Sequence, residues 1–159
     1  MTKARVGDSV GPYRVSEIRK ADLVQIKALW ENLNQLHLKD SRFFKDHYQN
    51  FIFEERIESW KDLPDEDFKV VVVSKEAQLL GYCVASLRGR VGEIESVYLE
   101  EPIRNSGIGG EIVRLCLDWL HQKQAKKIVV SVADGHESVI PFYQKLGFQP
   151  RLTYLELKE

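Results

Sequence analysis

One stretch decides the fold of this chain: Val97-Tyr98-Leu99-Glu100-Glu101-Pro102-Ile103-Arg104-Asn105-Ser106-Gly107-Ile108-Gly109-Gly110. Its first three residues favour a strand, which Pro102 ends. From Ile108 onward apolar residues recur with helical spacing, so a helix begins at the glycines. The first N–H groups of a helix have no partner within it, and glycine has no side chain to hold a ligand away. The stretch therefore predicts an anion-binding turn between a strand and a helix.

Two common phosphate-binding motifs do not fit this turn. A dinucleotide motif counted from Gly107 requires a glycine where the chain has Ile112. A Walker motif requires a Gly-Lys pair, which the sequence lacks. What remains is Arg104-x-x-Gly107-x-Gly109, or a helix cap that binds no ligand.

A second motif follows about thirty residues later: Pro141-Phe142-Tyr143-Gln144-Lys145-Leu146-Gly147-Phe148. With both motifs in this order, residues 79–148 resemble the GNAT superfamily of acyl-CoA-dependent N-acetyltransferases. The resemblance implies a GNAT-like central sheet of about seven strands, mixed but mostly antiparallel, with helices on both faces.

Length and charge limit the classes of protein. The 159 residues suit one domain, which we expect over residues 13–159 after a loose lead-in at 1–12. The net charge of −1 offers no basic stripe for nucleic acid. No apolar run approaches the ~20 residues of a membrane span, and the first ten residues lack a signal-peptide core. We therefore expect a cytoplasmic protein with no nucleic-acid or membrane partner.

The cysteines and histidines predict no metal site. Cys83 and Cys116 fall in a predicted strand and a predicted helix, where a small buried hydrophobic residue is the commoner identity. No Cys or His pair has the spacing of metal ligands. We expect two reduced core cysteines.

The chain predicts an α+β fold with a mixed sheet. Strands are expected at 13–19, 68–74, 79–87, 91–99, 127–132 and 151–157, and helices at about 23–36, within 38–63, at 106–124 and at 138–146. The short turns between the strands from 68 to 99 make that meander antiparallel. The unbroken apolar run at 127–132 favours a strand buried on both faces beside a parallel neighbour. Pro141 is tolerable near the start of the last helix, and Gly147 ends it.

Two carboxylates precede the glycine turn. Glu93 and Glu95 are two residues apart, so we expect both on the strand face to which Val97 and Leu99 also point. Glu93 lies eleven residues before Arg104, a spacing at which, by resemblance, some GNAT enzymes carry their general base. Glu95 is the reserve candidate, and mutual repulsion can raise one pKa of the pair. The alternative is that one or both form an ion pair with a neighbouring strand.

The resemblance implies that Tyr143 is the acid that protonates the departing CoA thiolate. The structural alternative is a packed aromatic side chain with its hydroxyl on a carbonyl group.

The resemblance also implies the acetyl-CoA contacts. Backbone groups of Val97, Tyr98 and Leu99 would pair with the pantetheine arm, and one N–H would face the oxyanion. An asparagine common in the family is His136 here, which we keep as a weak cofactor contact. The pyrophosphate would lie on Arg104, Asn105, Ser106, Gly107, Ile108, Gly109 and Gly110.

The expected function is transfer of an acetyl group from acetyl-CoA to a primary amine by direct attack in a ternary complex, without a metal. The acceptor is a cationic small amine, such as a polyamine or an aminoglycoside, or a protein lysine or N-terminus. Residues 38–63 carry aromatic side chains for a pocket, or for the core, and acids that attract a cation or form a solvated face: Asp40, Glu54, Glu55 and Glu58. The alternatives are a non-catalytic acyl-CoA binder and a protein-interaction module, and a homodimer is left open.

Overall fold

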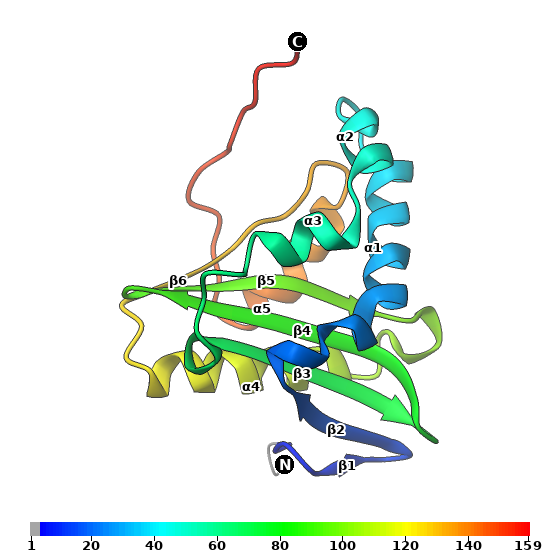
Figure 1. Ribbon diagram of the computed structural model, residues 1–159, viewed down its shortest axis with the longest axis vertical. Helices are drawn as coiled ribbons and strands as arrows, with labels where there is room; N and C mark the ends of the chain where they lie inside the picture. The colour runs from blue at the N-terminus through cyan, green and yellow to red at the C-terminus, as the bar shows by residue number, and fades with distance from the viewer. Residues whose placement is uncertain (1–3) are drawn as a thin grey trace.

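The computed structural model describes residues 4–159 and contains one six-stranded sheet with helices on both faces (Figure 1). The strands lie side by side in chain order, each antiparallel to the next until β6, which runs parallel to β5. The mixed α+β class that the sequence predicts is confirmed, with six strands rather than about seven. The strands are β1 (Ser9–Val10), β2 (Tyr13–Ile18), β3 (Phe68–Lys75), β4 (Gln78–Arg88), β5 (Val91–Leu99) and β6 (Lys127–Val130).

The described chain also contains five α-helices and four 3-10 helices, of which η4 and α5 follow the last strand. The predicted helix at 23–36 begins as a 3-10 turn before it becomes α1, and the predicted lead-in contributes the short strand β1. The helical elements are η1 (Lys20–Ile26), α1 (Lys27–Asp40), α2 (Lys45–Asn50), α3 (Phe53–Glu58), η2 (Asp65–Asp67), η3 (Glu101–Ile103), α4 (Ile108–Gln122), η4 (Glu137–Val139) and α5 (Ile140–Lys145).

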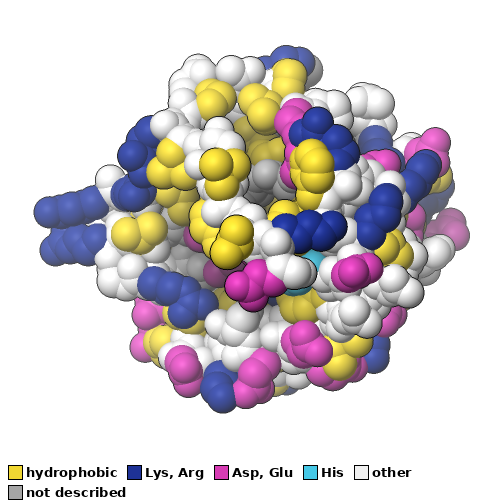
Figure 2. Space-filling model, turned by 90° about the horizontal axis from the view of Figure 1, so that it is seen from above, with side chains coloured by type: hydrophobic (Ala, Val, Ile, Leu, Met, Phe, Trp, Pro, Cys, Tyr) yellow, Lys and Arg dark blue, Asp and Glu magenta, His cyan; other side chains and the backbone are white. Residues whose placement is uncertain are grey.

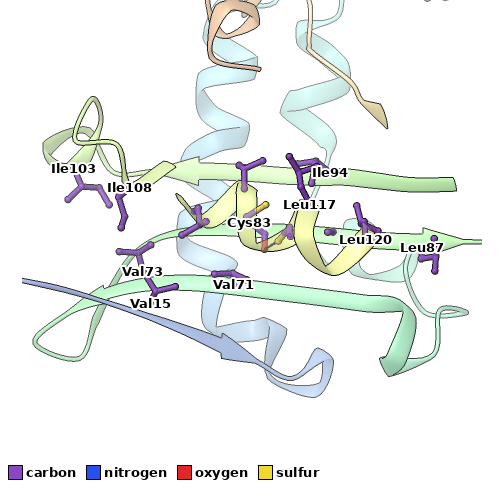
Figure 3. Packing of buried hydrophobic residues seen from close by; sticks show 14 residues of the cluster. Val15, Val71, Val73, Cys83, Leu87, Ile94, Ile103, Ile108, Leu117 and Leu120 are labelled. Atoms are coloured by element: carbon purple, nitrogen blue, oxygen red, sulfur yellow. Dashed lines mark hydrogen bonds between the residues drawn. The ribbon is translucent and has the colours of Figure 1, made fainter. Parts of the chain in front are cut away.

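The sheet separates two hydrophobic clusters. In β3 successive valines alternate, so Val71 and Val73 face α4 while Val70 and Val72 face α1 and α3. Figure 3 shows the cluster on the α4 side, where Ile94 and Leu117 meet between strand and helix. A central strand whose two faces are both covered explains the unbroken valine run.

Most predicted elements are confirmed. β3, β4 and β5 form the antiparallel meander, α4 follows the glycine turn, and β6 lies parallel to β5. Cys83 and Cys116 are free and buried, and Pro141 lies in the first turn of α5. No helix among residues 4–159 has the length and apolar character needed to cross a membrane.

The predicted last strand at 151–157 is wrong. These residues are irregular and exposed, and Figure 1 shows the C-terminal segment running away from the body. Residues 151–157 include side chains that favour a strand, but a strand also needs a neighbouring strand with which to pair. The predicted burial of the 127–132 strand on both faces is also wrong, because β6 is the edge of the sheet: Lys127 is exposed and Ile128 is only half-buried.

A β-bulge corrects the predicted orientation of β5. The register with β4 shifts between Val84 and Ala85, and the extra residue on β5 is Glu95. Glu93 and Glu95 therefore share the face covered by α3, whereas Val97 and Leu99 pack with the α4 cluster on the other face. Strict alternation failed because a single extra residue inverts the order of faces beyond it.

We expect alanine substitutions in α4 and in the C-terminal segment to change the free energy of unfolding by different amounts. Ile112 of α4 is fully buried, so Ile112→Ala lowers the free energy of unfolding by about 2–5 kcal/mol. Leu155 is 87% exposed, so Leu155→Ala changes it by less than about 0.5 kcal/mol. Urea denaturation followed by circular dichroism measures both. A loss of several kcal/mol in Leu155→Ala would instead mean that the C-terminal segment packs as a strand.

Candidate active site

β5 extends beyond its parallel neighbour. The pairing with β6 runs from Val91, opposite Lys127, only as far as Ile94, opposite Val130. β5 continues to Leu99, still paired on its other side with β4. Along the second half of β5, the peptide groups on the β6 side have no strand partner in the described chain. Such an open edge can pair with an extended ligand.

The open edge leads directly to the glycine turn at the N-terminus of α4. Gly107 has a φ of +87°, a left-handed conformation that glycine adopts without strain, and it has no side chain that could cap the helix. A Cβ atom built on Gly107 or Gly110 would meet nothing within 4 Å, so the space in front of them is open. The Ile108 N–H has a long hydrogen bond of 3.4 Å to Ser106 Oγ, and the next N–H groups of this helix of 15 residues are available to an anion.

Gly109 packs the turn closely against its neighbours. A Cβ atom there would lie 2.9 Å from Leu99 Cδ1 and 3.6 Å from the Phe142 ring. Absence of a side chain therefore lets α4, the end of β5 and α5 meet at one point. The two motifs that are about thirty residues apart in the sequence are brought together here.

The polar residues of the turn fix its own backbone. Ser106 Oγ donates to the carbonyl of Ile103 at 2.6 Å. Arg104 Nε donates to the carbonyl of Leu99 at 2.8 Å, and the guanidinium lies 5.5 Å from the centre of the Tyr98 ring. Arg104 therefore starts from a position folded over the end of β5, and its contact with a phosphate stays a prediction.

Glu93 and Glu95 lie together under α3. Burial, followed by hydrogen bonding to and repulsion by Glu95, raises the pKa of Glu93 to about 7, while Arg56 and Arg88 act in the opposite direction. A carboxylate with such a pKa can accept a proton near neutral pH. Glu95 is tied to Arg56, so the expected alternative of an ion pair holds for this carboxylate, although its partner comes from a helix and not from a strand.

Arg56 and Ser86 are site residues that the sequence did not indicate. Arg56 Nη2 donates to the Glu95 carbonyl at 2.7 Å and lies 3.3 Å from Glu95 Oε1, and Ser86 Oγ donates to Oε2 at 2.8 Å. Arg56 is 39 residues away in the chain and Ser86 sits in an ordinary strand pattern. Only the fold makes them neighbours of the carboxylates.

Tyr143 lies in α5, on the α4 side of the sheet. Its ring packs edge-on against Phe142 at 5.0 Å and Phe148 at 5.8 Å between centroids. Burial raises the pKa of its hydroxyl well above the usual value, so the phenol is neutral at pH 7. Glu93 is on the opposite face of β5, and no hydrogen bond within residues 4–159 joins it to Tyr143. Glu93 pairs with Val129 of β6, so it lies just before the open part of the edge begins.

His136 belongs to a contact between the β6–α5 loop and the end of α1. His136 Nε2 lies 3.0 Å from Asp40 Oδ2, and its ring is 4.7 Å from the His37 ring. Burial, and then repulsion by His136, lowers the pKa of His37 to about 4. Gly135 allows the close approach, because a Cβ atom there would lie 2.2 Å from the Asp40 carbonyl oxygen. A cofactor contact of His136 stays a prediction.

Most of the acids expected to attract a cation already have partners. Glu54 bonds to Lys27 at 2.7 Å, and Asp40 holds His136. Phe53 and Trp60 are core residues. In the view from above in Figure 2, acidic side chains lie along the lower part of the picture and hydrophobic side chains gather above them. One shallow pocket of about 420 Å³ keeps acids accessible and is lined by Asp46, His47, Asn50, Phe51 and Glu55.

A strand with an open edge, leading to a glycine turn at a helix N-terminus, is an arrangement that suits an acyl-CoA-dependent acetyltransferase. The family model of the acetyltransferase (GNAT) family matches residues 30–148. The chain therefore belongs to this family, as the sequence motifs indicated.

Solved structures share the fold over nearly their whole length. A putative acetyl transferase from Pyrococcus furiosus is 22% identical, with 92% of this chain and 99% of that chain covered and a TM-score of 0.69. The aminoglycoside N-acetyltransferase AAC(6')-Iy in complex with CoA is 12% identical, with 91% and 98% covered and a TM-score of 0.66. An aminoglycoside acetyltransferase from an uncultured soil metagenomic sample, in complex with sisomicin, is 14% identical, with 93% and 98% covered and a TM-score of 0.64.

The raised pKa of Glu93 predicts a pH-dependent stability difference. Because folding raises this pKa from 4.5 to about 7, the native protein binds more protons than the unfolded chain between these values, and its stability falls as the pH rises through them. Glu93→Gln removes this loss, so its free energy of unfolding exceeds that of the wild type by more at pH 8 than at pH 5. Urea denaturation at both pH values measures the difference.

The matched control is Glu66→Gln, at an exposed glutamate of η2. We expect it to differ from the wild type equally at both pH values. A Glu93→Gln difference that is constant, or that grows toward pH 5, would contradict the assigned environment of Glu93.

Proposed function

We propose that this protein transfers an acetyl group from acetyl-CoA to a primary amine by direct attack in a ternary complex. The observation that carries the proposal is the open edge of β5 after Ile94, which leads to the glycine turn at the N-terminus of α4. An extended arm needs a row of peptide groups and a diphosphate needs unpaired N–H groups. In this protein the open edge of β5 offers the peptide groups, and the start of α4, next along the chain, offers the N–H groups.

The described residues fit coenzyme A at this place. Backbone groups of Val97 and Leu99 would pair with the pantetheine arm, with one N–H toward the carbonyl oxygen of the thioester. The N–H groups from Gly107 to Gly110 would hold the diphosphate, and Arg104 would add a charge after it leaves Leu99. Acetyl-CoA would supply the activated acetyl group.

Glu93 would remove the proton that blocks the amine. An alkylammonium with the pKa of lysine is less than about 0.1% neutral at pH 7, and only the neutral form has a lone pair for attack. One proton of the ammonium first passes to Glu93, directly or through water. The neutral amine nitrogen then bonds to the acetyl carbon and the carbon–sulfur bond breaks, while a second proton leaves the nitrogen to water and the departing CoA thiolate takes up a proton from Tyr143, which water replaces. The raised pKa of Glu93 supports this assignment, because a base near pH 7 both accepts and releases protons.

Tyr143 would stabilise the departing thiolate. Its buried hydroxyl is neutral at pH 7 and so can donate a hydrogen bond or a proton. The pKa of Tyr143 also responds to Cys83, which pairs with Val97 in the open half of β5, and this supports a position of the hydroxyl beside the arm.

The acceptor would be a cationic small amine, of polyamine or aminoglycoside type, or a protein lysine or N-terminus. The accessible acids Asp46 and Glu55 beside the aromatic Phe51 support a cation at this end of the molecule. Two similar structures described above are named aminoglycoside acetyltransferases. A non-catalytic acyl-CoA binder is the second candidate, since one of the two carboxylates is tied up by Arg56.

An amine panel tests the activity. With acetyl-CoA and polyamines, aminoglycosides or lysine peptides as acceptors, CoA release is followed by a thiol reagent. We expect Glu93→Gln and Tyr143→Phe each to lower kcat by about 10²–10⁴-fold, the usual effect of losing a general acid or base. Calorimetry should find CoA binding unchanged in both. CoA binding by the wild type without turnover of any amine would favour the non-catalytic candidate.

The glycine turn is tested by a matched pair of substitutions. Gly107 and Gly7 have similar φ angles, +87° and +93°, and a Cβ atom on either meets nothing within 4 Å. Alanine therefore costs similar backbone strain at both, but only Gly107→Ala disturbs the N–H groups at the start of α4. We expect Gly107→Ala to weaken CoA binding about tenfold or more, which is about 1.4 kcal/mol, and Gly7→Ala to leave it unchanged. Equal effects on calorimetric affinity would remove the turn from the site.

A further inference from the structure

The carboxylate of Glu95 is held on both oxygens by side chains from two other elements. Arg56 of α3 approaches Oε1 at 3.3 Å and also donates to the Glu95 carbonyl at 2.7 Å, while Ser86 of β4 donates to Oε2 at 2.8 Å. The Glu95 side chain is only 6% exposed. An ionised carboxylate can accept both hydrogen bonds at once. Both oxygens of Glu95 are therefore occupied by side chains of the protein and are not free to contact a substrate.

Arg56 is itself fixed. Its guanidinium lies 4.6 Å from the centre of the Trp60 ring, and Trp60 is fully buried. A guanidinium that stacks on an aromatic face while it donates to a carbonyl and a carboxylate is held in one plane. Arg56 thus joins α3 rigidly to the bulge of β5.

The same contacts determine the charge around Glu93. The charged groups that act on it are Glu95 on β5, Arg56 on α3 and Arg88 on β4. Across the sheet, its neighbours are the neutral Ser86 on β4 and Val129 on β6. Contacts that favour the ionised form of Glu95 therefore keep a negative charge two residues from Glu93.

We propose that Arg56 is a positioning residue for acetyl transfer, which together with Ser86 holds Glu95 as an ionised carboxylate and leaves Glu93 as the carboxylate that takes the proton of the amine. This inference rests on the function proposed above. It divides the two glutamates by role: Glu95 supplies charge, and Glu93 supplies the exchangeable site.

Substitutions of the two partners have opposite consequences. Removal of Arg56 takes a positive charge from a pair of carboxyls of which one is buried and one is partly buried, so full ionisation of the pair requires a higher pH. Removal of the Glu95 charge takes away the repulsion, so Glu93 ionises at a lower pH. A purely structural role of Arg56 would lower the rate without moving either ionisation.

The test is the pH profile of kcat/KM on the best acceptor of the amine panel. For the wild type we expect an acid limb near pH 7. Arg56→Gln moves this limb up by about one pH unit, which lowers kcat/KM at pH 6 about tenfold, and Glu95→Gln moves it down. Arg56→Lys keeps the charge but loses the planar contacts of the guanidinium, so it moves the limb up by less than Arg56→Gln does. Lys61→Gln, which removes a positive charge that pairs with Glu58 just beyond α3, is the control and moves nothing.

A second variant and a second measurement test the same role of Arg56. Ser86→Ala removes only one hydrogen bond, so it moves the limb upward by less and replaces Arg56→Gln if that variant does not fold. Carbon-13 NMR titration of the Glu93 carboxyl should give the same directions without any turnover. A limb and a titration that stay in place in Arg56→Gln would overturn the role of Arg56. Absence of turnover in the wild type would overturn the proposed function, while the titration would still decide the role of Arg56.

Discussion

The unequal lengths of β5 and β6 are the constraint on which the site depends. β5 has nine residues and β6 only four, and their parallel pairing stops at Ile94. Peptide groups that would otherwise complete the sheet are left on the open edge, and in a folded protein such groups need a partner in water or in a ligand. Because the chain then turns at Gly107 into α4, and Gly109 packs closely against Leu99, the end of the open edge lies beside the start of the helix. The open edge follows from the end of β6, and the helix N-terminus beside it follows from the end of β5.

The fold was predictable because its elements have strong local signals. The run of β-branched valines in β3 and the helical spacing of the apolar residues in α4 are clear signals of a strand and a helix. Short turns leave few ways to connect the strands. The segment at 151–157 was mispredicted for a physical reason. Leu155 and Leu157 have the two-residue spacing of a strand, but a strand exists only against a neighbour, and local sequence does not say whether one is within reach.

The site was predictable where it is made of backbone. Glycine at 107 and 109 is itself the signal, since no side chain has to be found elsewhere. The side chains around Glu93 were not predictable in this way. The bulge at Glu95 inverts the faces of β5, and Arg56 reaches the strand from a helix. A two-residue repeat contains no information on either contact, so the division of roles between the glutamates emerges only from the fold.

The most direct measurement is an amide NMR titration of the nitrogen-15-labelled protein with coenzyme A. The open edge of β5 and the start of α4 should respond together, with the largest shifts at Leu99, Gly107 and Gly109. Amides of β1 and β2, at the far edge of the sheet, should stay in place. Shifts confined to other elements, or no shifts at millimolar CoA, would contradict the view that the unpaired end of β5 is the place where this protein binds its acetyl donor.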